Sequence, residues 1–99
     1  MNIWALKKDI PLKVLLLELK QRHNIFNLNL NRAEKNFQAI EIFLPDNPSL
    51  SAYVYTFGQN PNSYGIDLRY PITTHNIVGE NENLSLDQAL DIIAIHLFY

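Results

Sequence analysis

The sequence predicts one α+β domain, a two-layer sandwich in which an N-terminal and a C-terminal helix flank an antiparallel meander of three or four strands. Three features predict this fold: a leucine stripe at helical spacing near the start, a series of alternating segments in the middle, and a second apolar stretch at the end. A chain of 99 residues can bury one hydrophobic core but not two. We therefore expect residues 1–99 to form a single domain, with the C-terminal helix packed on the sheet.

The first helix is expected over residues 10–23. Asp9 is a residue type that can cap a helix, and Pro11 suits the first helical turn. Glu18 precedes Arg22 by four residues, which is the favourable order for an ion pair along a helix. The apolar stripe that predicts this helix consists of Leu12, Leu15, Leu16 and Leu19.

The middle of the chain contains four segments that alternate as strands with two different faces do. Turn-forming stretches rich in Pro, Asn, Asp and Gly separate the last three of these segments, at Pro45–Ser49 and Gly58–Ser63. Such short connections favour an antiparallel meander. The four segments cover residues 26–30, 37–44, 51–57 and 64–70.

The remaining segments are a loop, a second helix and an ambiguous start. No clear periodicity runs from Pro71 to Asn83, and we expect a polar loop there. Ser85 and Gln88 then match a capping box for a helix over residues 85–98, which is apolar over most of its girth and must lie against a large surface. Residues 1–8 are compatible with either a short strand or a helical turn.

Charge is divided unevenly along the chain. Residues 1–35 hold seven Lys or Arg against three Asp or Glu, whereas residues 36–99 hold one against seven. The absence of cysteine excludes a disulfide scaffold, a cysteine zinc site and a thiol nucleophile. The longest apolar run, Val14–Leu17, is too short to span a bilayer. We expect a cytoplasmic protein without a membrane partner.

No metal or catalytic motif accompanies the histidines. His23 ends the first helix on its core-facing stripe, His75 lies in the long loop, and His96 lies near the end of the second helix. None of the three has the spacing of a metal-ligand motif, although His75 could in principle join nearby carboxylates, Glu80 and Glu82, around a metal ion. We expect neither a metal nor a cofactor.

A pair of carboxylates could in principle perform acid–base chemistry. Asp87 and Asp91 are four residues apart on one helical face, and close carboxylates can raise one another's pKa. The simpler interpretation is that Asp87 favours the helix N-terminus and both residues keep the polar strip of the helix solvated. We therefore expect a protein that is not an enzyme.

The order helix, meander, helix resembles the double-stranded-RNA-binding fold, in which the second helix presents basic residues to phosphates. Here that helix opens with Ser85-Leu86-Asp87-Gln88 and has no Lys or Arg nearby. Negative charge at this position repels a phosphate backbone. The resemblance is one of topology, and we expect no nucleic-acid partner.

The leading functional expectation is a small bacterial binding protein that blocks a basic protein partner, of the kind represented by toxin-immunity proteins. Nucleic-acid-cleaving toxins have basic grooves, and an acidic protein can occupy such a groove by complementary charge. Tyrosines tolerate both burial and water, and they are common in protein–protein interfaces. The candidate partner-binding residues of this toxin inhibitor are Glu80, Glu82, Asp87, Asp91, Tyr53, Tyr55 and Tyr64.

Two alternatives remain open at this level. The chain could be a homo-oligomeric structural or regulatory module, a homodimer for example, with an interface on the aromatic strand face or at the apolar end Leu97-Phe98-Tyr99. It could also bind or transform a small molecule around His75. The alternation alone leaves open whether Tyr53 and Tyr55 face the helices or the outside.

Overall fold

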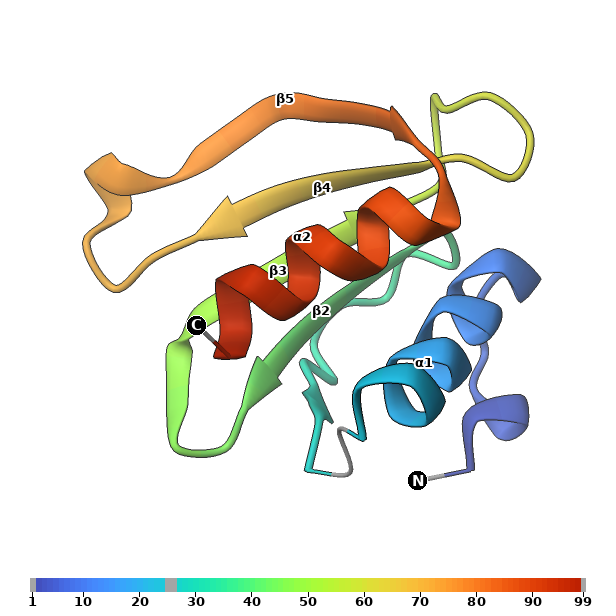
Figure 1. The fold of residues 1–99 in the computed structure, drawn as a ribbon, viewed down its shortest axis with the longest axis horizontal. Coiled ribbons are helices and arrows are strands. Elements are labelled where there is room, and N and C mark those ends of the chain that lie inside the picture. Colours follow the sequence, from blue (N-terminus) through green and yellow to red (C-terminus); the bar gives the residue numbers. More distant parts are fainter. Residues whose placement is uncertain (1, 25–26, 99) are drawn as a thin grey trace.

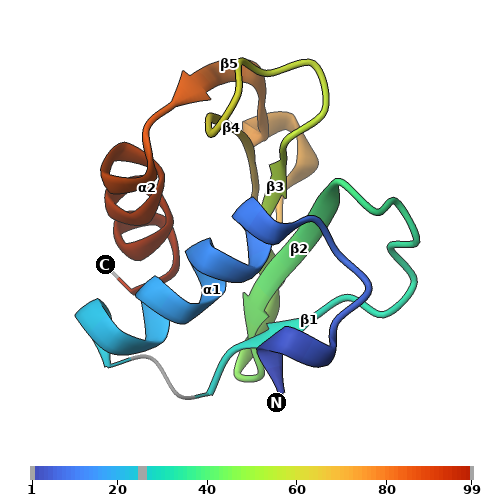
Figure 2. The same ribbon diagram turned by 90° about the vertical axis from the view of Figure 1, so that its right-hand side faces the viewer.

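A five-stranded antiparallel sheet covered on one face by two helices forms the protein (Figure 1). The structure is a computed structural model that describes residues 2–24 and 27–98. The strands follow one another in the sheet in chain order, β1-β2-β3-β4-β5. Figure 2 shows both helices on the same side of the sheet. The predicted α+β two-layer sandwich is thus confirmed, with five strands in place of three or four.

Helix α1 (Ile10–His23) has the predicted bounds and follows a short 3-10 turn at Ile3–Ala5, so the described part of residues 1–8 contains a helical turn and no strand. Asp9 occupies the N-cap position, and its backbone oxygen accepts hydrogen bonds from the first turn. Its carboxylate does not cap the helix, because it accepts a hydrogen bond from the Thr56 hydroxyl at 2.9 Å instead. The four stripe leucines are at most 1% exposed.

The strands form a meander with short turns between most neighbours. Their bounds are β1 Asn29–Leu30, β2 Ala39–Leu44, β3 Asn47–Tyr55, β4 Tyr64–Arg69 and β5 Ile77–Leu84. The first strand is much shorter than the predicted segment 26–30, and Phe26 lies outside the described residues. Within the described residues, the sheet contains one strand, β5, beyond the four segments predicted from the sequence.

The prediction of a loop from Pro71 to Asn83 is wrong for most of its length. A 3-10 turn at Thr73–His75 is followed by β5, which pairs with β4. The register of this pair shifts twice, and Gly79 and Asn83 both have positive φ angles. Each irregularity interrupts the alternation of side chains, so the strand has no period-two signal in its sequence.

Helix α2 (Leu86–Phe98) begins with the predicted capping box. The Gln88 amide donates to the Ser85 hydroxyl at 3.2 Å, and the Ser85 amide donates to the Gln88 side-chain oxygen at 2.9 Å. The helix packs mainly on β3, β4 and α1, and it buries Ala89, Leu90, Ile93, Ala94, His96 and Leu97.

The helix-covered face of the sheet contains the core. Strand residues that alternate toward the helices are at most 3% exposed, namely Ile40, Ile42, Ala52, Val54, Tyr64 and Ile66. Residues between them in the strands lie on the opposite face, which no helix of the described residues covers (Figure 2). Among the described residues, the helices are too short or too polar to cross a membrane.

Candidate functional site

The face of the sheet opposite the helices is here named the open face. Tyr53 stands at its centre, directly opposite Glu41 on β2 and Asp67 on β4. Three residues of the connections after β1 and β3 lie at its borders: Glu34, Phe57 and Gln59. Glu34 contacts Tyr53, Phe57 contacts Tyr55, and Gln59 contacts Glu82. The polar and aromatic strand residues of the open face include Glu41, Ser51, Tyr53, Tyr55, Asp67, Arg69 and Glu82.

A network around Glu41 occupies one side of the open face. The carboxylate accepts hydrogen bonds from the Asn31 amide at 2.8 Å, the Ser51 hydroxyl at 2.7 Å and the Arg69 guanidinium at 2.9 Å. Burial alone would raise the pKa of Glu41, but these three donors together lower it below its usual value. Glu41 is therefore held ionised within the domain, and its charge is matched by Arg69.

Tyr53 and Arg69 form a cation–π pair next to this network. The guanidinium carbon lies 4.6 Å from the centre of the Tyr53 ring, and the Tyr53 hydroxyl donates to Glu34 at 3.2 Å. Burial, followed by the charge of Glu34, raises the pKa of Tyr53. Among the described residues, Arg69 is the one Lys or Arg on a strand, and Glu41 and Tyr53 already engage it.

Tyr55 is held by three neighbours, Glu82, Phe57 and Gly65. Its hydroxyl donates to Glu82 at 2.7 Å, and its ring stacks on Phe57 with centres 4.7 Å apart. The ring also lies over Gly65, where no side chain competes for the space. Burial and the hydrogen bond to Glu82 raise the pKa of Tyr55. Only 6% of Tyr55 stays exposed, whereas Phe57 is 39% exposed and available for contact.

Acidic side chains without a cationic partner border these rings. Within the described part of the chain, the ion pairs involve Glu18, Asp87 and Glu41, and none involves Asp67 or Glu82. Between these two carboxylates lies a shallow cavity of about 300 Å³, lined also by Phe57 and the exposed Val78. The open face is consequently acidic and aromatic at its β4–β5 end.

The structure brings together three of the residues proposed from the sequence: Tyr53, Tyr55 and Glu82. Tyr64 lies on the other face, 3% exposed, with its hydroxyl donating to the Pro11 carbonyl oxygen at 2.8 Å. A side chain used in this way belongs to the core and is unavailable as an anchor for a partner.

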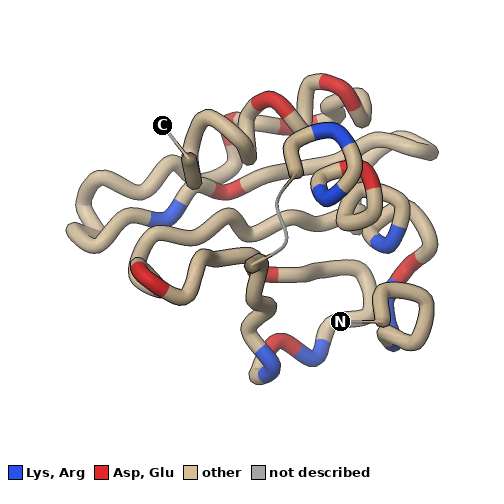
Figure 3. The backbone as a smooth tube through the Cα atoms, turned by 60° about the horizontal axis from the view of Figure 1, so that its bottom comes forward, with Lys and Arg blue, Asp and Glu red and all other residues tan. Residues whose placement is uncertain are grey.

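The four acidic candidates do not form one cluster. Glu82 reaches the open face, but Glu80 lines a groove on the helix side of β5, because the register shifts of this strand send the two side chains to opposite faces. Asp87 is paired with Arg22 of α1, and Asp91 is exposed on α2. Figure 3 shows the wider pattern: Lys and Arg gather on α1 and its flanking segments, while the strands and α2 contain most of the Asp and Glu.

The sequence identified part of the open face and missed its border. Phe57 continues the alternation of Tyr53 and Tyr55, so its place could be inferred from the same pattern. Glu34 and Gln59 lie in connections, where spacing along the chain gives no indication of the strand they approach.

The histidines have structural or exposed positions. His23 is exposed at the end of α1 rather than facing the core, and His75 is exposed in its 3-10 turn. The Nε2 atom of the buried His96 lies 2.8 Å from the Ser51 carbonyl oxygen and 3.2 Å from that of Arg69, so it donates to both. No three His, Asp or Glu side chains gather into a metal site within residues 2–24 and 27–98.

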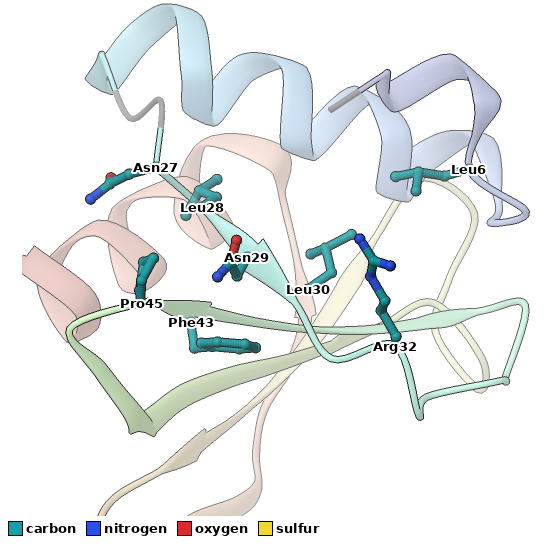
Figure 4. A pocket seen from close by; sticks show the side chains of 8 residues that line it. All are labelled: Leu6, Asn27, Leu28, Asn29, Leu30, Arg32, Phe43 and Pro45. Carbon is teal, nitrogen blue, oxygen red and sulfur yellow. The ribbon is translucent and has the colours of Figure 1, made fainter.

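Another cavity, of about 730 Å³, lies beside the sheet edge at β1. Figure 4 shows its lining: Leu6, Asn27, Leu28, Asn29, Leu30, Arg32, Phe43 and Pro45. Arg32 is the one charged residue of this lining and is exposed to solvent. The lining offers neither a carboxylate nor a histidine for proton transfer, and a lone exposed guanidinium is a weak anion site.

Searches among protein-family models, curated proteins and solved structures find no match to this chain. The chemistry of the described residues is therefore the basis for a functional conclusion. Fixed aromatic rings next to carboxylates without cationic partners can bind a cationic surface.

Proposed function

We propose that this chain is a small non-catalytic inhibitor that binds and blocks a basic protein, in the manner of bacterial toxin-immunity proteins. The observation that supports the proposal is the open face, where Phe57 and Tyr53 border the carboxylates of Asp67 and Glu82. A basic surface, such as the substrate groove of a nuclease toxin, has complementary charge to this end of the sheet. Complementary charge speeds association and selects the partner.

The side chains of the open face are ordered before any partner arrives. Hydrogen bonds fix Tyr53 to Glu34 and Tyr55 to Glu82, and Tyr55 is further fixed by stacking on Phe57. A preordered surface loses little side-chain entropy on binding, and this loss otherwise opposes association. The rings thus provide apolar contact area at a small entropic cost.

The cavity between Asp67 and Glu82 has the chemistry that accommodates one lysine or arginine side chain of the partner. Its aromatic lining includes Phe57, which is 39% exposed and offers ring surface to a cation, and its two carboxylates offer hydrogen-bond acceptors. We infer that a cationic side chain at this cavity forms the centre of the contact, with Phe57 and Val78 around it.

Self-association through the same face is the alternative. It would place Asp67 and Glu82 of one copy near the same carboxylates of another, and like charges oppose such a contact. At the C-terminal end Phe98 is 36% exposed, while Tyr99 lies outside the described residues. Light scattering is expected to give a monomer, and a stable dimer would favour the oligomeric module.

The test begins with the tagged protein purified from its host and with identification of the proteins that co-purify. A basic protein whose activity is inhibited on binding is expected. The double variant Asp67→Asn/Glu82→Gln should then slow association about tenfold at low salt and reduce its salt dependence. The matched control is Asp46→Asn, which removes an exposed carboxylate from the turn between β2 and β3. An acidic partner, or equal association rates for both variants, would contradict the proposal.

A further inference from the structure

An apolar groove lies between α2 and β5, on the opposite side of the sheet from the open face. It has a volume of about 430 Å³, in the size range of ligand pockets. Ile92 and Ile95 form its helical wall, and Ile77 and Leu68 belong to the strands at its base. The remaining lining residues are Tyr70, Glu80, Asn81 and His96.

The groove exists because α2 covers the middle of the sheet and not its edge. The helix packs mainly on β3 and β4, so the apolar side chains that it turns toward β5 are left without full cover. Ile95 is 63% exposed, and Ile92 is partly exposed. A row of apolar side chains open to solvent is a typical feature of a docking site.

Charge around the groove indicates what kind of segment it fits. Glu80 belongs to its strand wall, and Asp91 lies one helical turn before Ile95 on the exposed side of α2. The chain has no Lys or Arg after Arg69. Arg22 of α1 is paired with Glu18 and with Asp87, and Asp87 lies in the first turn of α2, at the opposite end from Ile95. The groove is therefore apolar at its base and acidic at its rims.

His96 adds a polar group to this apolar lining. Because its Nε2 atom donates to the carbonyl oxygens of Ser51 and Arg69, the neutral ring has Nδ1 as its acceptor. His96 is 9% exposed, and within the described residues no buried side-chain nitrogen or oxygen lacks a hydrogen-bond partner, so the ring supports the groove wall without selecting an occupant.

We propose that this groove docks an amphipathic, basic segment of a partner protein, with apolar side chains against Ile92 and Ile95 and with Lys or Arg next to Glu80 and Asp91. The proposal takes the basic class of partner from the proposed function and adds a second contact surface. A second copy of the chain is disfavoured as occupant, since α2 and β5 of the copy would bring Asp91 and Glu80 against the same charges.

The test uses a fluorescein-labelled synthetic peptide of alternating Leu and Lys. Its binding is measured by fluorescence anisotropy, and its site is mapped by NMR shifts of the isoleucine methyl groups. Two further peptides serve as probes, one with Glu in place of Lys and one with Ser in place of Leu. We expect binding of the Leu/Lys peptide, shifts at Ile92 and Ile95, and at least tenfold weaker binding of the other two.

Variants assign the contact to the groove. Ile95→Ser and Glu80→Gln should each weaken the binding of the Leu/Lys peptide about tenfold. The matched controls are Ile10→Ser, at an isoleucine of α1 that is 65% exposed, and Glu82→Gln on the open face; neither should change the binding of the peptide. Both isoleucines are exposed, so the serine variants should fold, which circular dichroism can verify.

Several results would overturn the groove proposal without touching the proposed function. Equal binding of the Ser/Lys peptide would reduce the contact to charge alone, and binding of the Leu/Glu peptide would remove the preference for a basic segment. Methyl shifts that spare Ile92 and Ile95, or a dimer that Ile95→Ser dissociates, would also exclude a partner segment in the groove. The Asp67→Asn/Glu82→Gln variant tests the open face separately, so the two proposals can fail independently.

Discussion

The ring of Tyr55 on β3 lies directly over Gly65 on β4, so closely that a Cβ atom added at residue 65 would lie 2.2 Å from the ring. Gly65→Ala should therefore push the ring aside and break its hydrogen bond to Glu82 and its stacking on Phe57. We expect a loss of about 1–3 kcal/mol in the free energy of unfolding, nearer the lower value because the ring is the end of a flexible side chain. Urea denaturation measures the loss.

A second variant separates this effect from the general cost of an extra methyl group. Tyr55→Ala removes the ring that residue 65 would meet, so adding Gly65→Ala to it should cost much less than the same change in the wild type. If Gly65→Ala instead costs the same free energy in Tyr55→Ala as in the wild type, contact with the Tyr55 ring is not the reason that alanine destabilises residue 65.

Removal of the capping box should destabilise the domain at the start of α2. Ser85→Ala deletes the acceptor for the Gln88 amide, and the expected cost is about 1 kcal/mol in the free energy of unfolding. Ser49→Ala, at an exposed position of β3, is the matched control and should change little. Equal thermal midpoints for the two variants would indicate that solvent satisfies the helix end as well as the serine does.

The sequence is sufficient to predict the elements whose pattern is local. The leucine stripe predicts α1, and the capping box predicts the start of α2. Both patterns are local, because helix periodicity and the hydrogen bonds at a helix end depend on residues only a few positions apart. Strand β5 was missed for the opposite reason. Its positive-φ residues Gly79 and Asn83 and its register shifts depend on pairing with β4, and pairing leaves no period in the strand itself.

The candidate site was predicted only in part for a related reason. Tyr53 and Tyr55 could be placed on one face by alternation, but the choice of face depends on which side the helices cover. Nearness along the chain suggested that Glu80 and Glu82 act together, and the irregular strand separates them. Asp87 is engaged by Arg22, a residue 65 positions earlier, which no spacing rule anticipates.

Acid should weaken the contribution of Glu41 to stability. Despite its burial, its hydrogen bonds from Asn31, Ser51 and Arg69 give it a pKa below the usual value, so its stabilisation is complete above the pKa of the unfolded chain and disappears as pH falls through the lower folded pKa. Glu41→Gln should cost about 1–3 kcal/mol at neutral pH. The cost should shrink toward pH 3, as measured by urea denaturation at both pH values. A cost that is constant with pH would contradict an ionised Glu41 network.

Alkali should weaken the contribution of Tyr64, the tyrosine that anchors α1 to the sheet through its hydrogen bond to the Pro11 carbonyl oxygen. Burial, with the charge of Asp9 in addition, raises the pKa of Tyr64 from 10.0 to about 12. The folded state therefore retains a proton that the unfolded chain releases. This stabilisation is complete below pH 10 and is lost as pH rises toward 12.

Tyr64→Phe tests this contribution because it removes the hydroxyl and keeps the ring. At pH 8 the variant should be about 1 kcal/mol less stable than the wild type, through loss of the hydrogen bond to Pro11. Between pH 10 and 12 the wild type should lose stability faster than the variant, so the difference between them should shrink and then reverse. Ser85→Ala, which removes a hydroxyl that does not titrate in this range, should keep a constant difference from the wild type. If the Tyr64→Phe difference also stays constant, Tyr64 ionises as readily in the folded chain as in the unfolded one, and the buried hydroxyl does not contribute to alkaline unfolding.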